Sequence, residues 1–352
     1  MEFNALLDEL KVDAILVTDG YNLRYFSKFR GGEGTLVITR NTRTLIVDSR
    51  YTEAAKEESD FRVVEYNREN PLLNIINDII ELENIKVMGF EDRSMLVSDY
   101  SDYLNNLKGL EGFVPVKDAL LKVRSIKTEE ELSYLKKAEE IGDMAFSDIL
   151  GIIKPGMTEL EIACELEYSM KRHGAAGFSF DTIVASGIHS SMPHAIPSEK
   201  KIENGDFITM DFGCLYNGYC SDMTRTVVCG KASDEQKEIY NIVLKANEMA
   251  EEAIHPGMMC KEADKVARDY IESKGYGKFF GHGLGHSVGL FIHESPALNM
   301  RDETILKPGM IETVEPGIYL PGKFGVRIED MGVVTEDGYV RYSNSPKELI
   351  EL

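Results

Sequence analysis

Residues 206–228, DFITMDFGCLYNGYCSDMTRTVV, have the pattern of a β-hairpin, with two β-rich arms around the turn signal Asn217-Gly218. If Asn217-Gly218 is the two-residue turn, Asp211 faces Thr224 and Asp222 lies diagonally beside Asp211. If the loop is centred slightly earlier, the two aspartates are directly opposed. Both registers place the carboxylates on one face of the sheet, because side chains alternate with a period of two. Like charges this close destabilise a fold without a cation between them, so the hairpin predicts a metal.

A second segment repeats the arrangement. In residues 311–330, IETVEPGIYLPGKFGVRIED, strands flank the turn PGKFG, and Glu315 and Glu329 pair about Gly322. Glu315 follows Asp211 by 104 positions. Each segment therefore delivers two acids from equivalent hairpin positions. Acids on one hairpin are usually solvated, but two matched pairs make coincidence much less probable.

The two hairpins belong to a longer internal repeat. The segments IIKPGMTELEIACELEYSMKRHGAAGF and AIHPGMMCKEADKVARDYIESKGYGKF share a Pro-Gly-Met turn followed by a helical pattern, 101 positions apart. Strand pairs then begin at Asn204-Gly205 and at Pro308-Gly309. One repeat is too short for a solenoid. We therefore expect two related halves that face each other, with an active site at their junction.

Three of the seven histidines, His282, His286 and His293, lie in the segment GHGLGHSVGLFIHESP. Its glycines let the backbone approach a site closely. They also disfavour a helix, and the glutamate of a zinc-protease HExxH helix is missing. No Lys-Ser/Thr follows, so a phosphate-binding loop is disfavoured as well. The segment is best interpreted as a source of metal ligands.

Four carboxylates and one imidazole form a hard-to-borderline ligand set. Such a set suits two close divalent ions, Mn²⁺ or Co²⁺, with Zn²⁺ and Fe²⁺ as alternatives. The two ions would balance the charge of the four carboxylates. A water bridging them would be acidified strongly toward hydroxide.

The sequence predicts two α/β domains. Residues 1–122 alternate strand patterns (VDAILV, GTLVIT, TLIVD, FRVVEY, IKVMGFE) with helical ones (residues 51–58 and PLLNIINDIIELE). Residues 123–352 form the second domain. It opens with a long helix that begins at Thr128, where Glu131 completes a capping box.

Composition excludes several classes of protein. A formal net charge of −21 argues against nucleic-acid binding, which requires clustered Lys and Arg. The five cysteines are odd in number and form no CxxC pair, which favours a reducing cytoplasm over a disulfide framework. The first residues are acidic where a signal peptide is basic, and no apolar run is long enough to span a membrane. We expect a soluble cytoplasmic protein.

The segments DFGCLYNGYCSDMTRT, GHGLGHSVGLFIHESP, TVEPGIY and GVRIED closely resemble the proline-specific metallopeptidases with the pita-bread fold, the prolidases and aminopeptidases P. The resemblance covers the whole chain. It implies a C-terminal pita-bread domain of two duplicated halves and a smaller N-terminal domain of creatinase type. The N-terminal domain would serve dimerisation and active-site capping, so a homodimer is expected.

The resemblance also implies a role for each site residue. Asp211 would bind one metal, His286 and Glu315 the other, and Asp222 and Glu329 both. Glu315 would move the proton from the attacking hydroxide to the leaving proline nitrogen. By the same resemblance, His194 and His293 would contact substrate, and His282 would stabilise the oxyanion. Arg327 and Thr224 would lie beside the acidic ligands.

The implied reaction removes the N-terminal residue from peptides whose second residue is proline. Many prolidases carry an arginine in HExPR that holds a dipeptide's carboxylate, whereas Ala297 stands there in this chain. We therefore expect an Xaa-Pro aminopeptidase, with an Xaa-Pro dipeptidase as the alternative and Arg301 as a substitute for the arginine. Methionine aminopeptidases usually lack so large an N-terminal domain, and creatinase lacks the full metal set. The alternative of another class is a non-catalytic pita-bread binding protein.

Overall fold

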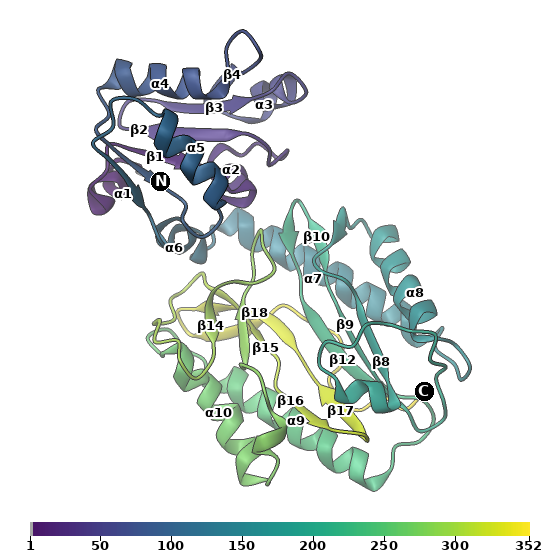
Figure 1. Ribbon diagram of the computed structural model, residues 1–352. Helices are drawn as coiled ribbons and strands as arrows, with labels where there is room; N and C mark the ends of the chain where they lie inside the picture. The colour runs from purple at the N-terminus through teal and green to yellow at the C-terminus, as the bar shows by residue number, and fades with distance from the viewer. Residues whose placement is uncertain (1–2) are drawn as a thin grey trace. The chain divides into compact units, whose positions relative to one another are not determined.

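The computed structural model describes residues 3–352 and contains two compact units (Figure 1). The first unit ends at Arg124 and the second spans Ser125–Leu352. Among the described residues, none of the helices combines the length and the apolar character that crossing a bilayer requires.

The first unit is a mixed six-stranded sheet in the order β4-β3-β2-β1-β5-β6, covered by helices on both faces. Successive residues of β1 serve opposite faces, since Ile15 and Val17 join one apolar cluster and Ala14 and Leu16 the other. The strands are β1 (Ala14–Val17), β2 (Thr35–Thr39), β3 (Arg43–Val47), β4 (Arg62–Glu65), β5 (Val87–Phe90) and β6 (Gly112–Pro115). The helices are α1 (Phe3–Leu10), α2 (Gly20–Ser27), α3 (Thr52–Glu58), α4 (Leu72–Glu83), α5 (Val97–Asn106) and α6 (Ala119–Ser125).

The second unit places four long helices behind several small antiparallel sheets. The helices are α7 (Glu129–Leu150), α8 (Glu159–Arg172), α9 (Asp234–Ala253) and α10 (Cys260–Ser273), with short 3₁₀ turns at Gly187–Ser191 and Gly277–Phe279. The capping box of Thr128 and Glu131 at the start of α7 is confirmed. The strands are β7 (Gly177–Phe178), β8 (Ile183–Ser186), β9 (Phe207–Phe212), β10 (Cys214–Tyr216), β11 (Tyr219–Cys220), β12 (Met223–Val228), β13 (Gly285–Ser287), β14 (Glu294–Leu298), β15 (Ile311–Val314), β16 (Gly317–Leu320), β17 (Phe324–Arg327), β18 (Asp330–Thr335) and β19 (Gly338–Arg341).

The internal repeat of the sequence is a structural repeat. Helices α8 and α10 both have 14 residues. The Pro-Gly-Met turns before them have nearly the same backbone, with φ of 90° at Gly156 and 92° at Gly257. In this left-handed region glycine avoids the steric penalty of a Cβ. The second unit therefore consists of two related halves, as predicted.

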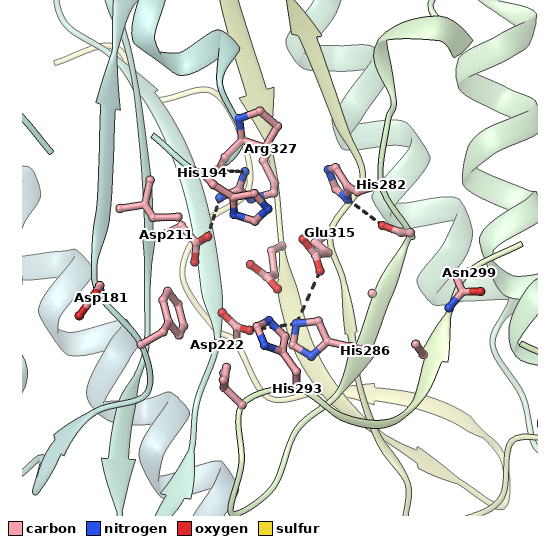
Figure 2. A pocket seen from close by; sticks show the side chains of 18 residues that line it. Asp181, His194, Asp211, Asp222, His282, His286, His293, Asn299, Glu315 and Arg327 are labelled. Atoms are coloured by element: carbon pink, nitrogen blue, oxygen red, sulfur yellow. Dashed lines mark hydrogen bonds and ion pairs between the residues drawn. The ribbon is translucent and has the colours of Figure 1, made fainter. Parts of the chain in front are cut away.

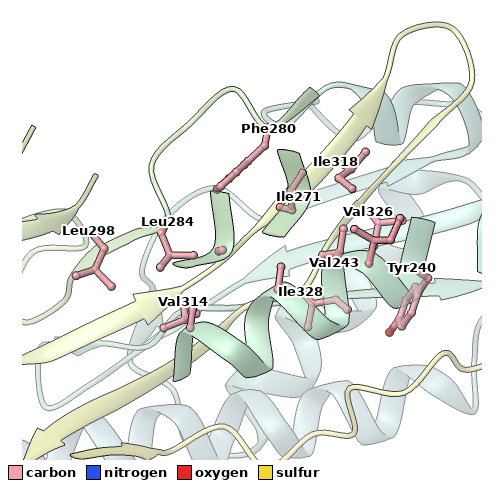
Figure 3. Close-up of a cluster of buried hydrophobic side chains, with 14 of the residues drawn as sticks. Tyr240, Val243, Ile271, Phe280, Leu284, Leu298, Val314, Ile318, Val326 and Ile328 are labelled. Carbon is pink, nitrogen blue, oxygen red and sulfur yellow. The ribbon is translucent and has the colours of Figure 1, made fainter. Parts of the chain in front are cut away.

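A large apolar cluster fixes the strands of the second half (Figure 3). It packs Tyr240 and Val243 of α9 against residues of strands β15–β17 and their flanks. Val314 and Ile328, both fully buried, directly precede Glu315 and Glu329. Because these core side chains are close-packed, they fix the backbone positions from which Glu315 and Glu329 project.

Candidate metal centre

The first acidic pair lies on the predicted hairpin. Strand β9 pairs with β12 so that Asp211 opposes Thr224, which is the first of the two registers considered. Asn217 and Gly218 form the turn, with φ of 46° and 79°, as a tight two-residue hairpin turn requires. Asp222 lies just before β12 and is 4% exposed.

The second pair does not lie inside strands. Glu315 falls between β15 and β16, and Glu329 falls between β17 and β18, where each chain changes its pairing partner. The backbone N–H of Glu315 donates to Leu284 O at 2.7 Å, and that of Glu329 donates to Thr224 O at 3.1 Å. The second bond joins the two halves, so it sets Glu329 against the strand that follows Asp222.

His286 faces these acids from β13, an extended segment rather than a helix, as the glycines predicted. Its Nε2 lies 3.4 Å from Asp222 Oδ2 and 3.7 Å from Glu315 Oε1. Ligand atoms of Asp222, His286 and Glu329 all lie within 4.8 Å of one another. Nδ1 of His286 contacts Ser287 O at 3.1 Å, which leaves Nε2 as the metal-facing nitrogen.

The electrostatics of the cluster favour cations. Burial, reinforced by neighbouring carboxylates, raises the pKa of Asp222, Glu315 and Glu329. Burial, with a contribution from His293, lowers the pKa of His286 to about 4, so its imidazole is neutral. Oδ1 of Asp211 is buried and accepts no hydrogen bond from residues 3–352. Crowded carboxylates, a neutral imidazole and an unpartnered acid oxygen form a donor set that fits divalent ions.

Arg327 lies beside the predicted ligands, as the family resemblance implied (Figure 2). It contacts Asp211 Oδ2 through Nη2 at 2.5 Å and Thr224 Oγ1 through Nε at 3.0 Å. The Thr224 hydroxyl in turn donates to Glu329 Oε2 at 2.7 Å. Both residues therefore orient acids from the two halves.

His282 also lines the site, but its ring is fully engaged. Nδ1 contacts Gly283 O and Nε2 contacts the hydroxyl of Tyr319, both at 2.8 Å. Since the carbonyl can only accept, Nδ1 carries the proton and Nε2 accepts from Tyr319. His282 thus has no free N–H for an oxyanion in this conformation, and its predicted role would require Tyr319 to move. Tyr319 was not predicted from the sequence, because it lies in an ordinary strand pattern.

These residues surround one cavity of about 510 Å³. His194 and His293 both line it, and the rings of His286 and His293 lie 4.7 Å apart. The remaining lining residues that the sequence did not single out include Phe180, Asp181, Ile183, Pro193, Ile292 and Asn299. The structure thus gathers all the predicted ligands and histidines around a single space, whereas Thr224 and the predicted substitute Arg301 lie outside its lining.

Two positions bear on substrate length. Ala297, which stands in place of the expected arginine, lines the cavity. Arg301 does not line it, and its side chain is exposed. Among residues 3–352, Arg327 is the one permanently cationic residue that lines the cavity. Arg301 is therefore not a substitute carboxylate ligand in this structure.

Comparisons with known proteins agree over the full length. Residues 133–336 match metallopeptidase family M24, and residues 2–126 match the creatinase/prolidase N-terminal domain. The Xaa-Pro dipeptidase of Pyrococcus furiosus is 41% identical over 98% of this chain and 97% of its own length. The structure of the Xaa-Pro dipeptidase from Bacillus anthracis has a TM-score of 0.96 at 44% identity, and the match covers 100% of this chain and 98% of that one. The X-Pro aminopeptidase from Thermotoga maritima MSB8 has a TM-score of 0.92 at 40% identity, with 99% and 100% covered.

Proposed function

This chain belongs to metallopeptidase family M24, with the creatinase/prolidase N-terminal domain before its peptidase domain, and we propose that it hydrolyses Xaa-Pro dipeptides. The predicted family resemblance, fold class and metallopeptidase character are confirmed. The observation that carries the proposal is the gathering of Asp222, His286 and Glu329 in one cavity of a chain so similar to named dipeptidases. A non-catalytic binding protein is correspondingly disfavoured.

The aminopeptidase expected from Ala297 becomes the second candidate. The named relatives at 41% and 44% identity are dipeptidases, which favours the shorter substrate. Ala297 and the likeness to the Thermotoga maritima X-Pro aminopeptidase are the observations that keep longer peptides under consideration.

In the proposed reaction, five side chains would hold two divalent ions: Asp211, Asp222, His286, Glu315 and Glu329. When bound, the ions supply Lewis-acid polarisation and lower the pKa of a bound water. Glu315 takes a proton from the attacking water at its carboxylate and delivers it to the proline nitrogen as the C–N bond breaks. The transfer is needed because the nitrogen would otherwise have to leave as a strongly basic anion. His194 and His293 are placed to contact substrate, and Arg327 and Thr224 keep the acids in position.

All five cysteines are free thiols, which supports a cytoplasmic location. The homodimer, and the role of the N-terminal unit in dimerisation and in covering the active site, stay predictions that light scattering and truncation would test. Mn²⁺ or Co²⁺ is the proposed metal.

The decisive experiment compares three substrates with the same first residue: an Xaa-Pro dipeptide, an Xaa-Pro-Xaa tripeptide and an Xaa-Ala dipeptide. With Mn²⁺ added, we expect the Xaa-Pro dipeptide to be cleaved best and chelation to abolish the activity. Preferential cleavage of the tripeptide would favour the aminopeptidase. Equal cleavage of Xaa-Ala would overturn proline specificity.

A further inference from the structure

A dipeptide substrate brings a free carboxylate into the cavity, and the lining offers it no spare cation. Of the five lining carboxylates, Asp211, Asp222, Glu315 and Glu329 are proposed ligands whose charge two divalent ions would offset, and Asp181 would repel the substrate's carboxylate. The guanidinium of Arg327 is already paired with Asp211. The turn at His282-Gly283 and the end of β14 line the cavity without contributing a carboxylate. With no unpaired cationic side chain in the lining, the substrate's carboxylate needs a neutral hydrogen-bond donor, which this wall offers at Asn299.

Asn299 is the uncommitted hydrogen-bond donor on this wall. Side chains alternate along β14 and its extension, so Ala297 and Asn299 line the cavity while Leu298 is fully buried in the core. Gly283 packs closely against this end of the strand, since a Cβ on it would meet Asn299 Cβ and Leu298 O at 3.0 Å. The position of Asn299 is therefore fixed from both sides.

The backbone also fixes which way the amide points. Oδ1 of Asn299 accepts from the N–H of Arg301 at 2.9 Å and of Asp302 at 3.1 Å. Two N–H donors can only face an oxygen, so the Nδ2 group must lie on the other side. Nδ2 donates to no acceptor among residues 3–352. Figure 2 shows the nitrogen on the side of Asn299 that faces the other labelled residues, with the oxygen turned away.

We propose that Asn299 determines the specificity for dipeptides by donating through Nδ2 to the substrate's C-terminal carboxylate. The inference rests on the proposed function and adds the residue that recognises the end of the substrate. A neutral amide in this position binds a carboxylate without excluding a neutral group, because its hydrogen also suits a peptide or amide carbonyl. The preference for dipeptides over longer substrates is then graded rather than absolute.

The test is Asn299→Asp, which replaces the amide by a group of nearly the same shape. One carboxylate oxygen still accepts from Arg301 and Asp302, while the other replaces the donor and repels the substrate's carboxylate. With an Xaa-Pro dipeptide and its C-terminal amide as paired substrates, we expect KM for the acid to rise more than about tenfold. KM for the amide should rise much less, because the substrate's amide N–H can donate to the new carboxylate, and kcat for both substrates should change little.

The ratio of kcat/KM for the acid to kcat/KM for the amide does not depend on the folded fraction of a variant, because misfolding lowers both activities equally. Asn299→Ala should move the ratio in the same direction, and Arg301→Ala, outside the cavity, should leave it unchanged. Calorimetric binding of a dipeptide with a reduced, uncleavable bond should weaken to the same extent as KM rises.

Two failures are distinguishable. A wild-type enzyme that cleaves no Xaa-Pro substrate would overturn the proposed function. A wild-type enzyme that cleaves the dipeptide, with an acid-to-amide ratio unchanged in both Asn299 variants, would overturn this inference alone.

Discussion

The guanidinium of Arg327 connects to Asp211 and Glu329, one acid from each half of the second unit. It contacts Asp211 directly and reaches Glu329 through the hydroxyl of Thr224. The same side chain donates to Tyr319 and to Pro193 O. A buried charge with this many partners is a positioning device, since the planar fork of arginine serves several acceptors at once.

We therefore predict that Arg327→Met weakens metal binding and lowers kcat/KM by at least about tenfold, because Asp211 and Thr224 lose their donor. Arg327→Lys keeps the charge but cannot serve all four partners, so it should recover only part of the loss. Metal content after dialysis and kcat/KM over a metal titration check both variants. Unchanged metal affinity in Arg327→Met would show that the ligands hold their own geometry.

The two predicted bridging acids give a separate test. Asp222→Ala or Glu329→Ala should remove most of the bound metal and abolish activity, because each acid is assigned to both ions. Asp181→Ala is the matched control for metal content, since Asp181 lines the cavity but lies outside the proposed ligand set. Full activity of either variant at low free metal would refute the bridging assignment.

A substitution at Glu315 can remove proton transfer while keeping an oxygen that binds metal. Glu315→Gln retains a ligating oxygen but cannot accept the proton, so we expect kcat to fall about 10²- to 10⁴-fold, the usual range for general acid–base catalysis. Circular dichroism should show an unchanged fold. A loss of less than about tenfold would mean that another group moves the proton.

Much of this site follows from the sequence because it depends on short-range rules. The turn at Asn217-Gly218 and the two-residue alternation determine the register that sets Asp211 opposite Thr224. The glycines around His286 correctly excluded a helix. Duplication then extended the prediction to Glu315 and its partner.

What the sequence did not reveal depends on contacts between segments distant in the chain. Glu329 leaves its hairpin and bonds to Thr224, which no local pattern encodes. Tyr319 and Asn299 look like ordinary strand and turn residues, and only the folded chain shows that they border the cavity or its histidine. Period-two alternation from Ala297 was the one signal that could have pointed to Asn299.

A buried ion pair lies next to two of the histidines. Nζ of Lys127 lies 3.2 Å from Glu294 Oε2 and 3.3 Å from Ser287 Oγ, and the side chains of Lys127 and Glu294 are 1% and 5% exposed. Glu294 directly follows His293, and Ser287 directly follows His286. The pair therefore fixes the backbone from which both histidines project.

For this pair we predict strong coupling. Lys127→Met and Glu294→Gln should each destabilise the protein, Lys127→Met by about 3 kcal/mol or more, because it leaves a buried charge without its partner. The double variant should recover much of the loss, since both charges are gone. Urea unfolding of the four proteins gives the coupling energy, and additive losses would contradict the predicted interaction.

We predict that His282 makes the stability of the protein depend on pH. Burial, followed by the charge of Arg327, lowers the pKa of this imidazole from 6.5 to about 4. Between pH 6.5 and pH 4 the unfolded chain binds a proton at His282 while the folded chain does not. The contribution to stability is thus intact above pH 6.5 and is lost as the pH falls toward 4, by at most about 3 kcal/mol.

His282→Gln should be less stable at pH 7, where its contacts to Tyr319 and Gly283 are changed, but should lose less stability than wild type on acidification. Urea unfolding of both proteins at several pH values measures the slope of stability against pH. Parallel slopes for wild type and His282→Gln would show that the folded ring takes up a proton as readily as the unfolded one, and below that pKa Tyr319 would have to accept from the ring rather than donate.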